Sequence, residues 1–151
     1  MTESEPSAST ESEFTDPAAQ GQYLTDLDTL TSSGGVDAGA ADINGRGFAR
    51  SVTLSANAAG PVSFAEYNLG RQWRTFSATV GLRDDSPTGG SLTFEVVVDG
   101  SKKYGKGIPL GESQEVKVDV THALRMKLII TYAGQEAGSY YYGSWGDAKL
   151  K

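Results

Sequence analysis

Apolar residues recur at every second position through several segments of the chain, and this rhythm limits the possible fold more than any other feature. In residues 74–82, for example, Phe76, Ala78 and Val80 alternate with small polar residues. Such alternation is typical of β-strands with one face on a core and the other in water. The clearest strands are expected at 74–82, 91–99, 115–120 and 125–132. Weaker strands are expected at 51–55, 62–69, 102–104 and 145–150.

The residues between these segments are typical of tight turns. Asn44-Gly45 is a two-residue hairpin signal between Ile43 and Phe48, and residues 84–90 form a cluster of Asp, Ser, Pro and Gly. No window of ten or more residues shows the apolar spacing of an amphipathic helix. Eight or nine short strands at this spacing predict an all-β fold, an antiparallel β-sandwich of the jelly-roll type.

The first 20 residues differ from the rest in composition. They contain five acidic residues, seven Ser or Thr residues and no Lys or Arg, and Phe14 is the one large apolar side chain. Such a segment cannot bury enough surface to offset the entropy of ordering it. We expect residues 1–21 to be a disordered linker and residues 22–151 to form one domain. No basic start or apolar run suggests a secretory signal.

Composition excludes several kinds of site and partner. The chain has no cysteine and one histidine, which excludes disulfides, thiolate metal sites and sites that need two imidazoles. Its net charge of −6 argues against nucleic acid or an anionic membrane as the main partner. No segment approaches the ~18 apolar residues of a membrane-spanning helix. As an isolated domain the chain is expected to be a monomer.

Several short blocks, taken in order, resemble a known family. They are residues 23–27 (YLTDL), 43–45 (ING), 48–52 (FARSV), 66–70 (EYNLG), 76–82 (FSATVGL), 84–86 (DDS), 92–96 (LTFEV) and 145–150 (WGDAKL). Together they resemble the NPCBM family of CBM51-like carbohydrate-binding modules over about residues 22–151. The resemblance implies a non-catalytic β-sandwich whose best-known ligands are galactose-type sugars. It also implies an extracytoplasmic location, as an accessory domain appended to a larger secreted or surface-attached bacterial protein.

The sequence departs from the family at one single position and in one short stretch. Arg50 stands where the family commonly has His, and residues 141–145 read Tyr-Tyr-Gly-Ser-Trp where the family commonly has Asp and His. This pattern fits a sugar module with altered specificity. It fits equally a protein-interaction or sensor domain that keeps the sandwich and has lost the sugar site, because fold does not fix function.

A sugar site needs an aromatic face for the C–H patch of a pyranose and polar groups for its hydroxyls. Tyr140, Tyr141, Tyr142 and Trp145 offer aromatic faces, while Arg50, Arg83, Asp84 and Asp85 offer hydrogen bonds. The ligand-binding set predicted from the sequence is Arg50, Asp84, Tyr141, Tyr142 and Trp145. The alternative is that alternate tyrosines and Trp145 belong to the core. Strict strand alternation places Trp145 on the face opposite Ala148 and Leu150 unless a bulge intervenes. The sequence therefore does not fix the face of the strand on which Trp145 lies.

Other chemistries have weaker support. Asp84 and Asp85 are adjacent in a turn, whereas glycoside hydrolysis needs carboxyl groups on opposite sides of the scissile bond. No cofactor is expected; calcium is an alternative that would use Asp26, Asp28, Asp37 or Asp42, although no twelve-residue calcium loop is present. We interpret His122 as a loop residue and the basic cluster Lys102, Lys103 and Lys106 as a solvated hairpin. The sequence therefore favours a carbohydrate-binding module over an interaction domain and over a hydrolase.

Overall fold

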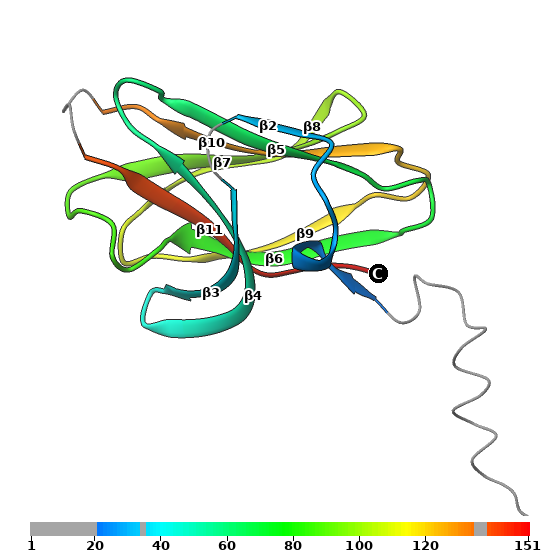
Figure 1. Cartoon of the computed structure of the whole chain (residues 1–151), viewed down its shortest axis with the longest axis horizontal. Helices are drawn as coiled ribbons and strands as arrows, with labels where there is room; N and C mark the ends of the chain where they lie inside the picture. Colours follow the sequence, from blue (N-terminus) through cyan, green and yellow to red (C-terminus); the bar gives the residue numbers. More distant parts are fainter. Residues whose placement is uncertain (1–20, 34–35, 135–138) are drawn as a thin grey trace, which may run out of the picture.

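The computed structural model describes residues 21–33, 36–134 and 139–151, and residues 1–20 of the expected linker lie outside these ranges. Eleven strands and one short 3-10 helix make up the described chain (Figure 1). The strands are β1 (Gln22–Tyr23), β2 (Thr31–Ser33), β3 (Val36–Ile43), β4 (Arg46–Ala56), β5 (Val62–Asn68), β6 (Thr75–Leu82), β7 (Ser91–Val98), β8 (Ser101–Pro109), β9 (Gln114–Asp119), β10 (Arg125–Tyr132) and β11 (Tyr141–Leu150). The helix, η2, spans Leu24–Asp26. The described residues contain no helix long and apolar enough to cross a membrane.

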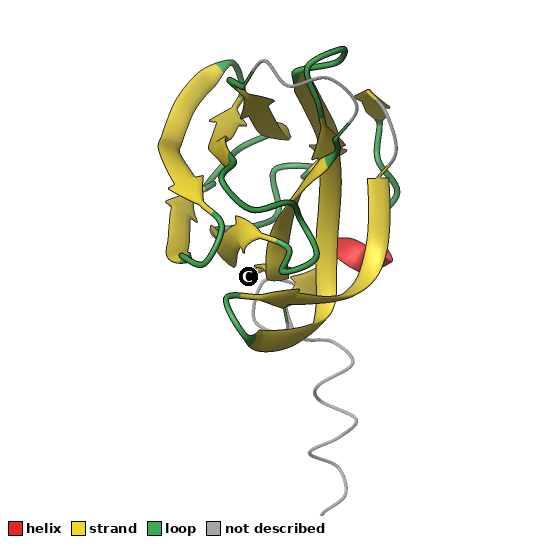
Figure 2. Ribbon diagram, turned by 90° about the vertical axis from the view of Figure 1, so that its left-hand side faces the viewer, coloured by secondary structure: helices red, strands yellow, loops and turns green. Residues whose placement is uncertain are grey.

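The strands form two antiparallel sheets that pack face to face (Figures 1 and 2). One sheet has the order β3-β4-β11-β6-β9, with β1 paired to the end of β11. The other has the order β2-β5-β10-β7-β8. The predicted all-β sandwich of jelly-roll type is confirmed, as is the absence of long helices in the described part of the chain. The strands number eleven instead of eight or nine, because β1, β2 and β3 pair with longer strands although they show no clear alternation.

The alternating positions of the strong strands fill the space between the sheets, as predicted. In β10, Met126, Leu128 and Ile130 are fully buried, and their neighbours on β7 and β5 are buried with them. Trp145 lies at the centre of this core with no exposed surface. Its ring meets Phe94 edge-on at 5.5 Å between centroids and Phe76 at 6.4 Å. Each aromatic pair of this kind contributes about 0.5–1.5 kcal/mol beyond the burial of its area.

A β-bulge in β11 resolves the uncertain side of Trp145. The register against β6 shifts between Gly146 and Lys149, and Asp147 adopts a left-handed backbone with φ +49°. This extra residue restores the inward direction of Ala148 and Leu150, which share the core with Trp145. The core alternative for Trp145 therefore holds, and the ring cannot contact a ligand.

The β3–β4 hairpin curls over the outer face of the first sheet (Figure 1). Its turn is the predicted Asn44-Gly45 pair, and both residues have positive φ (51° and 77°), as a type I′ turn requires. A Cβ at Gly81 would lie 2.6 Å from Cγ2 of Ile43, and a Cβ at Gly146 would lie 2.7 Å from Cγ of Phe48. The two glycines therefore let Ile43 and Phe48 bury against the sheet, which stabilises the curled hairpin by about 1.5–3 kcal/mol for each side chain.

Candidate functional site

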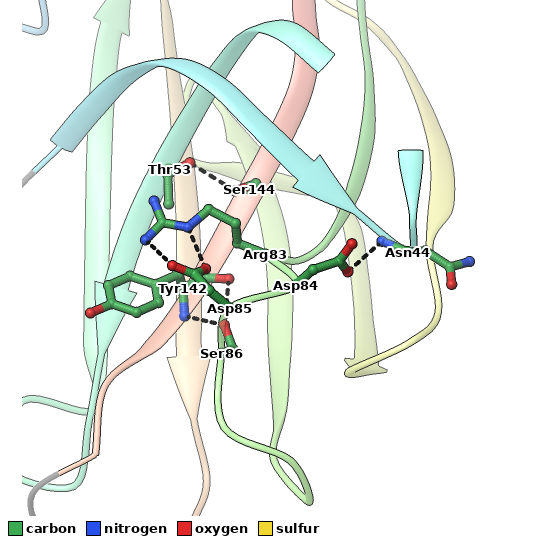
Figure 3. Close-up of polar contacts among 8 residues, drawn as sticks. All are labelled: Asn44, Thr53, Arg83, Asp84, Asp85, Ser86, Tyr142 and Ser144. Atoms are coloured by element: carbon green, nitrogen blue, oxygen red, sulfur yellow. Dashed lines mark hydrogen bonds and ion pairs between the residues drawn. The ribbon is translucent and has the colours of Figure 1, made fainter. Parts of the chain in front are cut away.

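A hollow of about 510 Å³ lies between the curled hairpin and the segment that follows β6. It is lined by Ala40, Ala41 and Asp42 from β3 and by Arg83, Asp84 and Asp85. We call it the hairpin hollow. Figure 3 shows the polar contacts beside it, with Arg83 and Asp85 next to Tyr142. The hairpin hollow therefore joins segments that lie about forty residues apart in the sequence.

Arg83 is fixed from two directions. Its Nε donates to Oδ1 of Asp85 at 2.6 Å, and its Nη2 donates to Oδ2 at 3.0 Å (Figure 3). The guanidinium also lies over the ring of Tyr142, with Cζ 4.3 Å from the ring centroid. The Asp85 hydrogen bond raises the pKa of Arg83, and the same bond lowers the pKa of Asp85. The pair is therefore ionised at neutral pH, and Arg83 is held rigidly with Nη1 left over for a further partner.

Asp84 has a structural role within the site. Its two carboxylate oxygens accept the backbone N–H groups of Asn44 and Gly45, each at 2.8 Å. Its own N–H donates to the carbonyl oxygen of Asp42 at 2.9 Å. Asp84 thus ties the hairpin turn to the end of β6 and positions the hollow.

Backbone and hydroxyl contacts hold the same segment against β11. The N–H of Arg83 donates to the carbonyl oxygen of Tyr142 at 2.7 Å, and the N–H of Tyr142 donates to Oγ of Ser86 at 3.0 Å. Behind them, the buried hydroxyls of Thr53 and Ser144 share a hydrogen bond of 2.7 Å (Figure 3). These contacts make the floor of the site part of the sheet rather than a free loop.

The tyrosine run divides between the two faces of β11. Tyr141 is 3% exposed and stacks on Tyr132 with 4.7 Å between the ring centroids. A Cβ at Gly90 would overlap the Tyr141 ring, so the ring fills this space completely. Tyr142 is half-buried on the outer face, and Tyr140 is exposed. The expectation that Tyr141 and Trp145 bind a ligand is corrected: both side chains are core.

Arg50 lies apart from the hairpin hollow. Its Nη1 pairs with Oδ2 of Asp26 at 2.8 Å, and its guanidinium lies 5.0 Å from the ring centroid of Tyr23. Lys149 approaches the same ring at 5.2 Å. Of the five residues predicted from the sequence, the structure therefore brings only Asp84 and Tyr142 together, and it adds Arg83, Asp85 and Asp42.

The acidic residues considered for calcium are not gathered into one cluster in the described part of the chain. Within residues 21–33, 36–134 and 139–151, no group of three or more His, Asp or Glu side chains is placed to hold a metal ion. Asp26 is instead paired with Arg50. In the basic hairpin, Lys102 pairs with Glu95 at 3.3 Å between Nζ and Oε2.

The hairpin hollow offers both kinds of hydrogen-bonding group. Nη1 of Arg83 can donate, and the exposed carboxylates of Asp42 and Asp85 can accept. Tyr142 adds an aromatic surface beside them. This is the chemistry that a polyhydroxylated ligand needs. The arrangement does not resemble a hydrolytic centre, because Asp84 is bonded to the turn and Asp85 is held ionised by Arg83.

The role of Asp42 and the pairing of Arg83 with Tyr142 were not predicted. They depend on the curl of the hairpin, which brings β3 over the end of β6. The one available signal was glycine inside two strands, at Gly81 and Gly146, since such a glycine often marks a close approach of another segment.

Comparisons with known proteins place these features in context. The model of the NPCBM/NEW2 domain family matches residues 13–151. No curated protein matches the chain. CBM51 from Clostridium perfringens GH95, solved in complex with methyl-galactose, is 24% identical with a TM-score of 0.72, and the match covers 87% of this chain and 99% of that one.

Two larger structures are also similar. CBM51-2 in complex with GlcNAc, solved with INT domains from Clostridium perfringens ZmpB, is 21% identical with a TM-score of 0.68, over 86% of this chain and 31% of that one. The tandem CBM51 modules of Sp3GH98, a family 98 glycoside hydrolase from Streptococcus pneumoniae, are 19% identical with a TM-score of 0.70, over 86% of this chain and 46% of that one. This chain therefore spans less than half of either, and the likeness establishes a shared fold.

Proposed function

Because the chain belongs to the NPCBM/NEW2 domain family of carbohydrate-binding modules, we propose that it binds sugar without catalysis, through the hairpin hollow. The observation that carries this proposal is the placement of Arg83, which lines the hollow, is hydrogen-bonded twice to Asp85 and lies over the half-buried ring of Tyr142 beside it. Arg83 needs no rearrangement before it binds, so little conformational entropy is lost on association.

The ligand class is a neutral sugar of the galactose type. Three carboxylates, those of Asp42, Asp84 and Asp85, line the hollow against the single cation of Arg83. This excess of negative charge disfavours an acidic sugar there, whereas carboxylates are good acceptors for sugar hydroxyls. The methyl-galactose complex of the similar CBM51 module from Clostridium perfringens supports galactose as the first ligand to test.

The parent protein and the location of the domain are inferred from the same similarities. We propose that the domain is an accessory module of a larger extracytoplasmic protein and that it binds as a monomer. The similar modules of ZmpB and Sp3GH98 occur in multi-module proteins, which supports this setting. Binding needs no metal in this proposal, and nucleic acid is not a partner.

A glycan array tests the proposal, with the full chain applied both in calcium and in a chelator. We expect hits on terminal galactose that are the same in both buffers and that are lost in Tyr142→Ala and in Arg83→Met. Tyr140→Ala is the matched control, because Tyr140 neighbours the site in sequence but is 52% exposed and lines a different hollow, whereas Tyr142 packs against Arg83. A folded protein with no glycan hit, or loss of binding in Tyr140→Ala alone, would refute the proposal and favour a protein-interaction domain.

A further inference from the structure

A second hollow lies at the opposite end of β6 from the hairpin hollow. Its volume is about 240 Å³, and it is lined by Arg71, Gln72, Trp73, Arg74, Thr121 and His122. We call it the loop hollow, because its lining comes from the β5–β6 and β9–β10 connections. The 8 residues of β6 separate the two hollows by about 26 Å at ~3.3 Å per residue. They are therefore independent sites.

Two residues at the rim of the loop hollow hold an unfavourable backbone conformation. Arg71 has φ +62° and His122 has φ +63°, in the left-handed region that costs a non-glycine residue about 1–2 kcal/mol. Three hydrogen bonds keep the loops in place: the N–H of Leu69 donates to Leu124, the N–H of Arg71 donates to Ala123, and Nη1 of Arg71 donates to the carbonyl oxygen of His122 at 3.0 Å. Glycine at either position would avoid the cost, so the two side chains are candidates for a function.

The charged side chains that line the loop hollow are Arg71 and Arg74. Of the described residues that line it, none is acidic. Two carboxylates lie close by without lining it. Asp99 accepts the N–H groups of Leu124 and Arg125 and also interacts electrostatically with Arg71. Asp119 accepts the N–H and hydroxyl of Thr121 and also interacts electrostatically with His122. Arg71 keeps Nε and Nη2 for another partner, and the exposed imidazole of His122 lies beside it. Arg74 makes a contact of its own, so Arg71 and His122 are the groups available.

We propose that the loop hollow binds the anionic substituent of an acidic sugar, a carboxylate or a sulfate ester, through Arg71 and His122. The guanidinium supplies two N–H groups that match the oxygens of either substituent, and the imidazole supplies another. The volume is smaller than the ~300–1,000 Å³ of sites that enclose a drug-sized ligand. It suits one sugar residue or its charged group. The inference goes beyond the neutral-sugar function proposed above and does not depend on it.

Calorimetry with three sugars of matched ring structure tests this inference. The probes are galactose, galacturonate and galactose 6-sulfate, titrated into the full chain at one fixed ionic strength. The Tyr142→Ala variant removes the aromatic ring that packs against Arg83 beside the hairpin hollow, so we expect it to lose galactose and to keep at least one of the two acidic sugars. The two acidic probes differ in their charged group and therefore distinguish carboxylate from sulfate recognition.

Variants locate the acidic sugar in the loop hollow. Arg71→Gln is expected to weaken its binding about tenfold or more, as the loss of a charge-assisted hydrogen bond should. Arg125→Gln is the matched control, because it removes the same charge near the same loops and does not line the hollow; we expect a change below about twofold. His122→Gly is expected to weaken binding without lowering the melting temperature, because φ +63° suits glycine.

Three results would overturn the inference. The first is that neither acidic sugar binds the wild-type chain. The second is that Tyr142→Ala abolishes the binding of both acidic sugars. The third is that Arg71→Gln and Arg125→Gln weaken the binding of the acidic sugar equally. If galactose fails to bind while an acidic sugar binds through Arg71, the function proposed for the hairpin hollow is refuted and acidic-sugar binding in the loop hollow is supported.

Discussion

Tyr141 and Tyr142 are adjacent in the chain, and substituting each by alanine should have opposite consequences. Tyr141→Ala removes a ring that is 3% exposed and stacked on Tyr132, against a glycine backbone at Gly90 that cannot fill the space. Tyr142→Ala removes a half-buried ring on the outer face, where the guanidinium of Arg83 lies over it. The first change should therefore affect stability, and the second should affect ligand binding.

The structure sets the size of each effect. Truncation of a buried aromatic to alanine costs about 3–5 kcal/mol of unfolding free energy, since a cavity is left. For a domain of this size that corresponds to a fall in melting temperature of about 10 °C or more. Loss of the Tyr142 ring removes a partly exposed cation–π contact, which contributes about 0.5–1 kcal/mol, and a modest buried area. Its melting temperature should fall by less than about 5 °C.

Thermal and urea unfolding of the two variants, followed by calorimetry with galactose, separate these effects. We expect Tyr141→Ala to be strongly destabilised and, at a temperature where it stays folded, to bind galactose as the wild type does. We expect Tyr142→Ala to unfold almost as the wild type does and to lose galactose. Equal destabilisation in the two variants, or normal galactose binding by Tyr142→Ala, would refute the assignment of the two faces of β11.

Three further outcomes follow from the same contacts. Asp84→Ala should lower the unfolding free energy by about 1–2 kcal/mol and weaken galactose binding, because the hairpin turn loses two charge-assisted hydrogen bonds; unchanged urea unfolding would contradict this. Gly146→Ala should cost about 1–3 kcal/mol, because its Cβ would lie 2.7 Å from Phe48, whereas Gly105→Ala, with 3.6 Å to its nearest neighbour, should be nearly neutral; comparable urea midpoints for both would exclude this packing. Backbone hydrogen bonds hold the pKa of Asp99 below its ordinary value of about 4, so its contribution to stability is complete above pH ~4 and is lost as the pH falls through the lowered pKa. The difference in melting temperature between wild type and Asp99→Asn should therefore shrink from pH 6 to pH 2, and a constant difference would contradict the role of the ionised carboxylate.

The fold could be predicted from the sequence because its main signal is local. The alternation in residues 91–99 and 125–132 depends only on which side chains point inward, and the structure places these segments in β7 and β10. The Asn44-Gly45 turn likewise carries its own backbone preference. Strands without alternation, such as β2, form through pairing with a neighbour, and the sequence holds no local sign of them.

The site was predicted only in part because it depends on contacts between distant segments. Trp145 follows the wrong period for a core residue unless the bulge at Asp147 is known. Arg50 was favoured by its place in the family pattern, yet Asp26 engages it in an ion pair. Arg83 was one of several candidate cations, and only the curl of the hairpin places Asp42 beside it.

The most direct test of the account is a titration of the ¹⁵N-labelled chain with methyl galactoside, followed by the backbone amide shifts. We expect saturable shifts confined to the hairpin hollow and the residues beside it, at Asp42, at residues 83–86 and at Tyr142, and no change at Arg71 or His122 in the loop hollow. Shifts that cluster around Arg50, or no saturable shift at any amide, would contradict the claim that this domain binds sugar through Arg83 and Tyr142.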